Sequence, residues 1–149
     1  MIKHIWSVLC QKSVIDSDTN NITLFDILER IDIEIKIENP QLPEPERINI
    51  PINFEIVSFF ENTDPLKNTS GDNIIEFCDS KGQVLNSFKQ EVKMPKGMKR
   101  LRARFKINGL AVNKVSSDYV FRIKLKSHDM EKYKTLTEIP FETSIKIHN

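Results

Sequence analysis

IDIEIKI, residues 31–37, places an isoleucine at every odd position and a charged residue at every even position. Successive side chains of a β-strand point to opposite faces, so this period of two predicts a strand with one buried and one solvated face. The composition agrees, because the chain has 20 isoleucines and only two alanines, Ala103 and Ala111. Isoleucine suits a pleated surface, whereas alanine is the best helix former.

The same alternation recurs along the rest of the chain. It is clear in three further stretches, Ile48–Ile56, Leu101–Ile107 and Tyr119–Leu125, and weaker in five more, Ile2–Cys10, Ile22–Leu28, Asn73–Cys78, Gln83–Met94 and Leu136–Ile147. No window carries the apolar stripe of period 3.6 that is typical of an amphipathic helix. The sequence therefore predicts eight or nine strands and no helix.

Strands with one apolar face are stable when two layers bury those faces against each other. With 149 residues the chain has the length of one domain. We therefore expect a single all-β domain over residues 1–149, an antiparallel two-layer β-sandwich of the immunoglobulin-like or C2-like kind. Pro51 and Pro140 interrupt good strand patterns, which places them at sheet edges or bulges.

The beginning of the chain resembles a known family. Leu9-Cys10, followed by the stretch Asn20–Ile27, is similar to the opening of a family of small bacterial proteins of unknown function. The resemblance implies a single β-sandwich with a cysteine at the end of its first strand. Gln11 and Asn20-Asn21 depart from the acidic residue and the glycines that are usual in that family. The resemblance implies no activity and assigns no functional residue.

Two cysteines and a short apolar N-terminus point to a reducing compartment. Cys10 and Cys78 are too few for a disulfide framework, and the first ten residues lack the apolar run of a secretory signal. No stretch is long and apolar enough for a membrane helix. We therefore expect a cytoplasmic protein with reduced thiols.

No catalytic, metal-binding or cofactor-binding motif stands out. Asp16 and Asp18 match the first half of a calcium loop, but Asn21 and Ile27 stand where that loop needs glycine and glutamate. A turn whose side chains bond their own backbone is the favoured interpretation, with a weak calcium site as the alternative. Only four glycines occur, so a glycine-rich phosphate loop is excluded. We expect no cofactor and no enzymatic activity, unless a cysteine is reactive.

Charge is distributed unevenly along the chain. Residues 1–92 contain 8 Lys/Arg and 16 Asp/Glu, a net charge of −8, whereas residues 93–149 contain 14 and 5, a net charge of +9. Alternation places basic side chains together on the outer faces of two predicted strands. The resulting candidate face for a partner or an anion consists of Lys99, Arg100, Arg102, Arg104, Lys106, Arg122 and Lys124.

Three interpretations of this face remain open. The favoured one is internal pairing with the acidic face of Asp32, Glu34 and Glu38. The second is a protein partner or another copy of the chain, guided by complementary charge. The third is the phosphate backbone of a nucleic acid, although no exposed aromatic row accompanies the cations for base stacking.

A candidate edge adds to the case for a partner. Pro51 suggests that its strand lies at a sheet edge, which would expose Val57 and Phe59. An exposed apolar edge invites strand addition by another chain. The sequence thus predicts a binding module that engages a protein or itself, with a nucleic-acid-binding accessory protein as the alternative.

Overall fold

The computed structural model describes residues 1–36, 46–115, 117–128 and 130–148, and among them it contains nine strands and no helix. The strands are β1 (Ile2–Ile15), β2 (Ile22–Ile27), β3 (Arg30–Lys36), β4 (Arg47–Asn62), β5 (Thr69–Asp79), β6 (Val84–Met94), β7 (Arg100–Asn113), β8 (Ser117–Ser127) and β9 (Lys134–His148). Each overlaps one of the nine stretches in which alternation predicts a strand. The prediction of an all-β chain is therefore confirmed.

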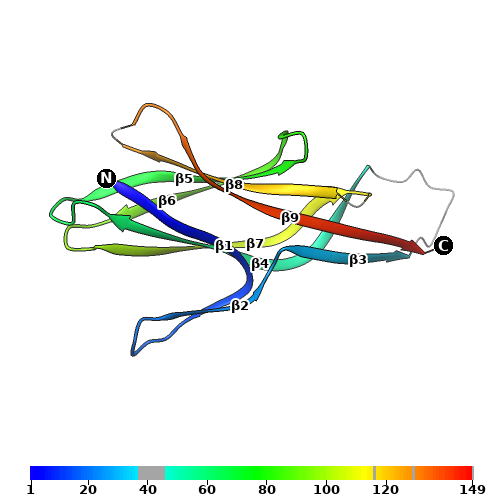
Figure 1. Ribbon diagram of the computed structural model, residues 1–149, viewed down its shortest axis with the longest axis horizontal. Helices are drawn as coiled ribbons and strands as arrows, with labels where there is room; N and C mark the ends of the chain where they lie inside the picture. The colour runs from blue at the N-terminus through cyan, green and yellow to red at the C-terminus, as the bar shows by residue number, and fades with distance from the viewer. Residues whose placement is uncertain (37–45, 116, 129, 149) are drawn as a thin grey trace.

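The strands form two sheets (Figure 1). Sheet A has the order β2-β1-β4-β7, and sheet B has the order β3-β9-β8-β5-β6. Six of the seven strand pairings are antiparallel, and one is parallel: β3 pairs with β9 in the same direction, with Arg30 opposite Glu142. The expectation of purely antiparallel pairing is thus wrong at this edge. Parallel neighbours need a long crossover, and the chain from β4 to β8 supplies it.

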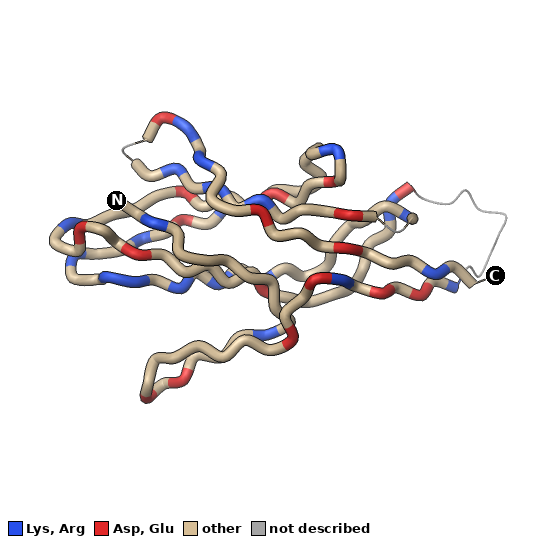
Figure 2. Tube along the Cα trace, in the orientation of Figure 1, with Lys and Arg blue, Asp and Glu red and all other residues tan. Residues whose placement is uncertain are grey.

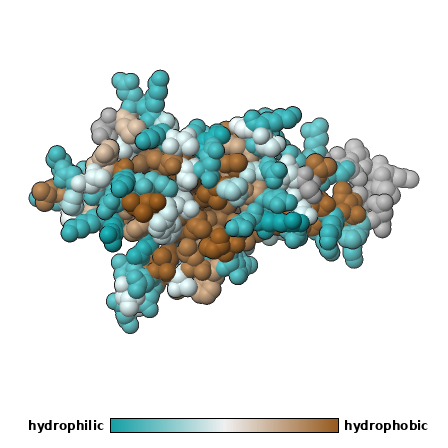
Figure 3. Space-filling view, viewed as in Figure 1, coloured by the Kyte–Doolittle hydropathy of each residue, from teal (hydrophilic) through white to brown (hydrophobic). Residues whose placement is uncertain are grey.

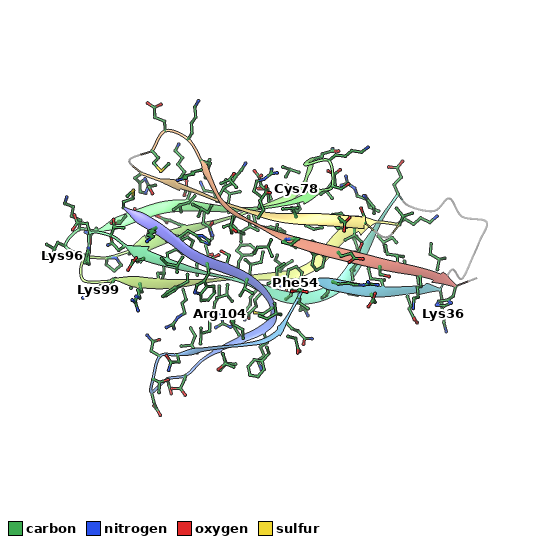
Figure 4. All side chains as sticks on the ribbon, in the orientation of Figure 1. Lys36, Phe54, Cys78, Lys96, Lys99 and Arg104 are labelled. Carbon is green, nitrogen blue, oxygen red and sulfur yellow. The ribbon has the colours of Figure 1, made fainter. Side chains whose placement is uncertain are left out.

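Apolar side chains from both sheets meet in a shared core. Leu9 and Ile56 of sheet A pack with Ile75 and Ile123 of sheet B, and all four are at most 1% exposed. Aromatic rings fill the centre, where Phe121 lies between Phe54 and Phe77, with ring centroids 5.7 and 4.8 Å away. Phe54 marks this region in Figure 4.

Tyr119 anchors the beginning of β8. Its ring is buried and stacks on Phe77, with ring centroids 4.8 Å apart. Its hydroxyl accepts a hydrogen bond from the backbone N–H of Asn113 at 2.7 Å. This bond ties β8 to the end of β7, a strand of the opposite sheet.

The two prolines take different positions in their strands. Pro51 lies where the β4–β7 register shifts between Ile50 and Asn53, so the bulge interpretation is confirmed for it. Pro140 lies in β9 just before the pairing with β3 begins at Glu142, where no described strand covers that side of β9. Proline, which has no backbone N–H, fits both positions, because at neither position does a neighbouring strand need a hydrogen bond from that residue.

The predicted exposed edge at Val57 and Phe59 is wrong. β4 lies inside sheet A, between β1 and β7, so its backbone is paired on both sides. Val57 is 0% exposed, and Phe59 is partly covered by the Trp6 ring at a centroid distance of 5.5 Å. Because Pro51 lies at a bulge, where the regular β4–β7 pairing is interrupted, its missing N–H does not require an edge position.

The actual projecting edge is the β1–β2 hairpin. β1 bends along its length, and its second half leaves the body of the molecule together with β2 (Figure 1). β2 is the last strand of sheet A, and no described strand pairs with its outer side. The tight turn at the tip uses Asn20 in the left-handed region, with φ of 54°.

Candidate functional site

The cations of the predicted basic face lie on two separate sheets. β7 belongs to sheet A and β8 to sheet B, so the two sets do not form one surface. Figure 2 shows acidic and basic positions interspersed along both sheets, apart from a short basic run at the beginning of β7. The structure therefore divides the candidate face into two groups.

The β8 cations are paired with carboxylates of the neighbouring strands. Arg122 donates to Glu138 on β9 at 2.7 Å and lies 3.4 Å from Glu76 on β5. Lys124 donates to the same Glu76 at 2.8 Å. The pKa of Arg122 is raised, mainly by its hydrogen bond to Glu138. This group forms an ion-pair network across sheet B.

On β7, Arg102 and Arg104 are bound to the β1–β2 hairpin. Arg102 Nη2 donates to the carbonyl of Asn20 at the hairpin tip at 2.6 Å, and its guanidinium carbon lies 6.0 Å from the centre of the Phe59 ring. Arg104 Nη2 donates to the Ser13 carbonyl and to Glu55 Oε1, both at 3.0 Å. Figure 4 shows Arg104 near the junction of hairpin and body.

Glu55 is the buried centre of this junction. It is 6% exposed and accepts hydrogen bonds from Arg104 and from the Ser13 hydroxyl. Burial works to raise the pKa of Glu55, but the hydrogen bonds from Arg104 and Ser13 and the nearby charges outweigh it, so the pKa lies below its usual value. The Ser13–Glu55–Arg104 cluster links β1, β4 and β7.

Three of the seven cations, Arg104, Arg122 and Lys124, pair with carboxylates inside the molecule, but the expected pairing with Asp32 and Glu34 is wrong. Asp32 pairs with Arg30 on its own strand at 2.9 Å, and Glu34 lies 4.0 Å from His148. Glu38 falls outside the described residues. The acidic partners that sequence reasoning missed are Glu55, Glu76 and Glu138. In the sequence, Glu55 and Glu76 each stand between two apolar residues within a strand, and this position could have identified them as partners for a cation of a neighbouring strand.

The remaining cations of the candidate face are exposed. Lys99, Arg100 and Lys106 take part in no ion pair among the described residues. Lys99 lies beside Lys96 at the end of the molecule nearest the N-terminus (Figure 4). What is left is a basic group at Lys99 and Arg100 and a separate cation at Lys106, about 20 Å further along β7, instead of a continuous stripe.

Both cysteines are buried and unpaired. Cys10 and Cys78 are each 0% exposed. Burial is the main cause that raises the pKa of both thiols, and for Cys10 the charge of Glu55 adds to it. A raised pKa leaves little thiolate at neutral pH, and the thiolate is the reactive form. Neither thiol has the environment of an activated nucleophile.

The histidine and acidic candidates for metal binding have local roles. His4 Nε2 lies 2.8 Å from the Ser7 hydroxyl, and burial lowers the pKa of His4. Asp16 Oδ1 accepts hydrogen bonds from the backbone of Asp18 and from Thr19, as expected for a self-bonded turn. Within the described ranges no three His, Cys, Asp or Glu side chains are grouped to hold a metal ion.

The hairpin exposes a cluster of apolar side chains. Val14 is 42% exposed, Phe25 47% and Ile27 52%. A hollow of about 510 Å³ is lined by Val14 and Phe25 together with Gln11, Lys12 and Asn53. Val14 and Phe25 lie on the face of the β1–β2 ladder opposite Ser13, because Val14 follows Ser13 and Phe25 is paired with Lys12, and β2 is the last strand of sheet A.

A larger groove lies at the base of the hairpin. It has a volume of about 670 Å³ and runs between β1 and the turn after β2 on one side and β8 and β9 on the other. Val8, Leu28 and Ile139 contribute apolar lining, and Asp118 and Glu142 contribute carboxylates. In the space-filling view, apolar surface occupies the middle of the molecule where the hairpin leaves the body (Figure 3).

No helix that could span a membrane is found in the part of the chain that the structure describes. No protein-family model matches the chain, and neither the curated proteins nor the solved structures yield a match.

Proposed function

We propose that the protein is a non-enzymatic, cytoplasmic binding module that engages a protein partner through the β1–β2 hairpin. The observation that carries this proposal is the exposure of Val14, Phe25 and Ile27 beside the free edge of β2. An edge strand with apolar side chains and unpaired backbone groups is a template for another strand. Partners that add a strand gain affinity from main-chain hydrogen bonds and specificity from side-chain pockets.

The structure of the hairpin supports a docking role over a packing role. Its inner side is fastened to β4 and β7 by the Ser13–Glu55–Arg104 cluster, and its tip is held by Arg102. A fastened hairpin can present its outer side without losing much conformational freedom when a partner binds. The 510 Å³ hollow beside Phe25 is large enough to receive apolar side chains of the added strand.

The experiment is photo-crosslinking in cells. A benzoylphenylalanine replaces Phe25 in the full chain, and a control chain carries it at Leu66, which is 76% exposed on the loop between β4 and β5. A discrete crosslinked product at position 25, and none at position 66, supports docking at the hairpin. A product at twice the mass of the chain identifies a second copy as the partner. Equal products at both positions, or none at position 25, contradict the proposal.

We also propose that the fold is an immunoglobulin-like two-layer sandwich instead of a C2-like one. The order β9-β8-β5-β6 corresponds to strands G-F-C-C′ of that fold, and β1-β4-β7 corresponds to A-B-E. The Tyr119 hydroxyl bond to Asn113 resembles the tyrosine corner that precedes strand F. Membership of the family that Leu9-Cys10 resembles stays a prediction, and the fold by itself implies no activity.

A further inference from the structure

The 670 Å³ groove at the base of the hairpin combines apolar walls with an acidic rim. Its volume lies within the roughly 300–1,000 Å³ that is usual for ligand sites. Leu9 and Phe141 form part of the wall and are at most 2% exposed, so the groove is continuous with the shared core. An occupant of this groove would therefore gain the free energy of burying apolar surface.

Three acidic residues, Glu29, Asp118 and Glu142, line the groove. Asp118 and Glu142 stand directly opposite each other on β8 and β9, and Glu29 is the residue whose carbonyl accepts the N–H of Glu142 at 2.9 Å. Like charges in cross-strand register destabilise a sheet. Arg30 lies 3.6 Å from Glu142 and offsets one of these charges. Glu29 and Asp118 are exposed and take part in no ion pair among the described residues.

The surplus of negative charge selects a cationic group beside the apolar walls. Within the described part of the chain these carboxylates belong to no group of three or more side chains that could hold a metal ion. An ammonium or guanidinium on a flexible side chain fits, since it can bond separated carboxylates while its carbon stem covers apolar surface. The charge of the rim is thus complementary to lysine or arginine.

The backbone of β1 adds a reason to expect a peptide. The Leu9 carbonyl points to the side of β1 that faces the groove, where it accepts the N–H of Leu28 at 3.0 Å. Polar groups on one side of a strand recur every second residue, so those of Ser7 face the same way. No described strand pairs with that side of β1 before Cys10. β9 offers less to a peptide, because Pro140 has no N–H.

We propose that this groove binds an extended peptide segment of a partner protein in which a lysine or arginine stands beside a large apolar residue. The apolar side chain occupies the space between Val8, Leu28 and Ile139, and the cation lies at Asp118 and Glu142. This site does not depend on strand addition at β2. The two share only Ile27, which lies at the end of the hairpin and at the rim of the groove.

The test is a nuclear magnetic resonance titration of the ¹⁵N-labelled full chain with three blocked tripeptides. Each has leucine at both ends, and the middle residue is arginine, glutamine or glutamate. We expect saturable shifts of the amide signals of Leu28, Ile139 and Asp118, with the arginine peptide binding about fivefold or more tightly than the glutamate peptide. Equal binding of these two peptides, or saturable shifts only elsewhere, would overturn the proposal.

Variants test the source of the charge preference. Asp118→Asn combined with Glu142→Gln removes the repulsive pair and should abolish the preference for arginine while leaving the fold intact. Glu131→Gln, an exposed carboxylate on the loop after β8, is the matched control and should keep the preference. A preference that survives in the double variant overturns the assignment of the cation to this pair.

Octylamine separates a peptide site from a site for amphiphilic amines. It has an apolar chain and an ammonium but no peptide groups to pair with β1. Weaker binding than the arginine peptide at the same amide signals supports the peptide. Binding as tight as that of the peptide overturns the peptide as occupant. Absence of saturable shifts with the arginine peptide up to about 10 mM overturns the site as a whole.

Discussion

Removing the charge of Glu55 should loosen the hairpin and destabilise the protein. Glu55→Gln keeps the shape and one acceptor oxygen, but it removes the counter-charge of Arg104. A hydrogen bond to a charged group contributes about 1.5–3 kcal/mol. Arg104 is 32% exposed, so water partly replaces the lost partner. We therefore expect the free energy of unfolding to fall by about 2–3 kcal/mol, which lowers Tm by about 4–12 °C for a chain of this size.

The assay is urea unfolding followed by the fluorescence of Trp6, the single tryptophan, which lies on β1 beside Phe59. Glu61→Gln is the control, because Glu61 lies on β4 like Glu55 but takes part in no ion pair among the described residues. This variant should change the free energy of unfolding by less than about 0.5 kcal/mol. Hydrogen exchange should quicken in β2 of the Glu55→Gln variant. A loss below about 0.5 kcal/mol in this variant would refute the reasoning.

The pH dependence gives a second check on the same cluster. The pKa of Glu55 in the folded state lies below the 4.5 of the free side chain, so its contribution is complete above that value and is lost as the pH falls through the folded pKa. The difference in stability between the native chain and Glu55→Gln should therefore be constant near neutral pH and shrink below about pH 4.5. A difference that persists unchanged to pH 3 would contradict the assigned ionisation.

Arg104→Met should cost more than Glu55→Gln, about 3–5 kcal/mol, because it leaves a carboxylate at 6% exposure without its counter-charge. Replacing both residues, Glu55→Leu with Arg104→Met, should cost less than the sum of the two single changes, since the buried charge is then gone. Additive losses would show that the two side chains act independently.

Two further predictions concern the alternatives to protein binding. Labelling of Cys10 and Cys78 with a thiol reagent at pH 7 should be at least about 100-fold slower in the native chain than in the unfolded chain, because both thiols are buried. The labelling rate should increase as the pH rises, because the pKa of both thiols is raised. Fast labelling of the native chain at pH 7 would restore the reactive-cysteine alternative. Fluorescence anisotropy with labelled oligonucleotides should give weak binding with a slope of log K against log salt no steeper than about −3. The reason is that, among the described residues, only Lys99, Arg100 and Lys106 of the candidate face have no partner in an ion pair or side-chain hydrogen bond. A steeper slope that disappears when Arg100, Arg102 and Arg104 are replaced by serine would favour nucleic acid.

The strands themselves followed from the sequence. Alternation such as that of residues 31–37 is a property of a single strand, because the pleat fixes which residues share a face. The same local logic marked Pro51 as a position at an edge or a bulge and favoured the self-bonded turn at Asp16. Burial of both cysteines was also predictable, since they lie in apolar stretches.

Which strands become neighbours was decided only by the tertiary structure. The alternation of β4 and β7 does not reveal that β4 is an interior strand, that β3 runs parallel to β9, or that Arg104 meets Glu55. Each of these depends on contacts between residues far apart in the chain, and an outward charge looks the same in sequence whether water or another strand covers it. The groove exists for the same reason, because Val8, Asp118 and Ile139 become one surface only when β1, β8 and β9 are brought together by the packing of two sheets.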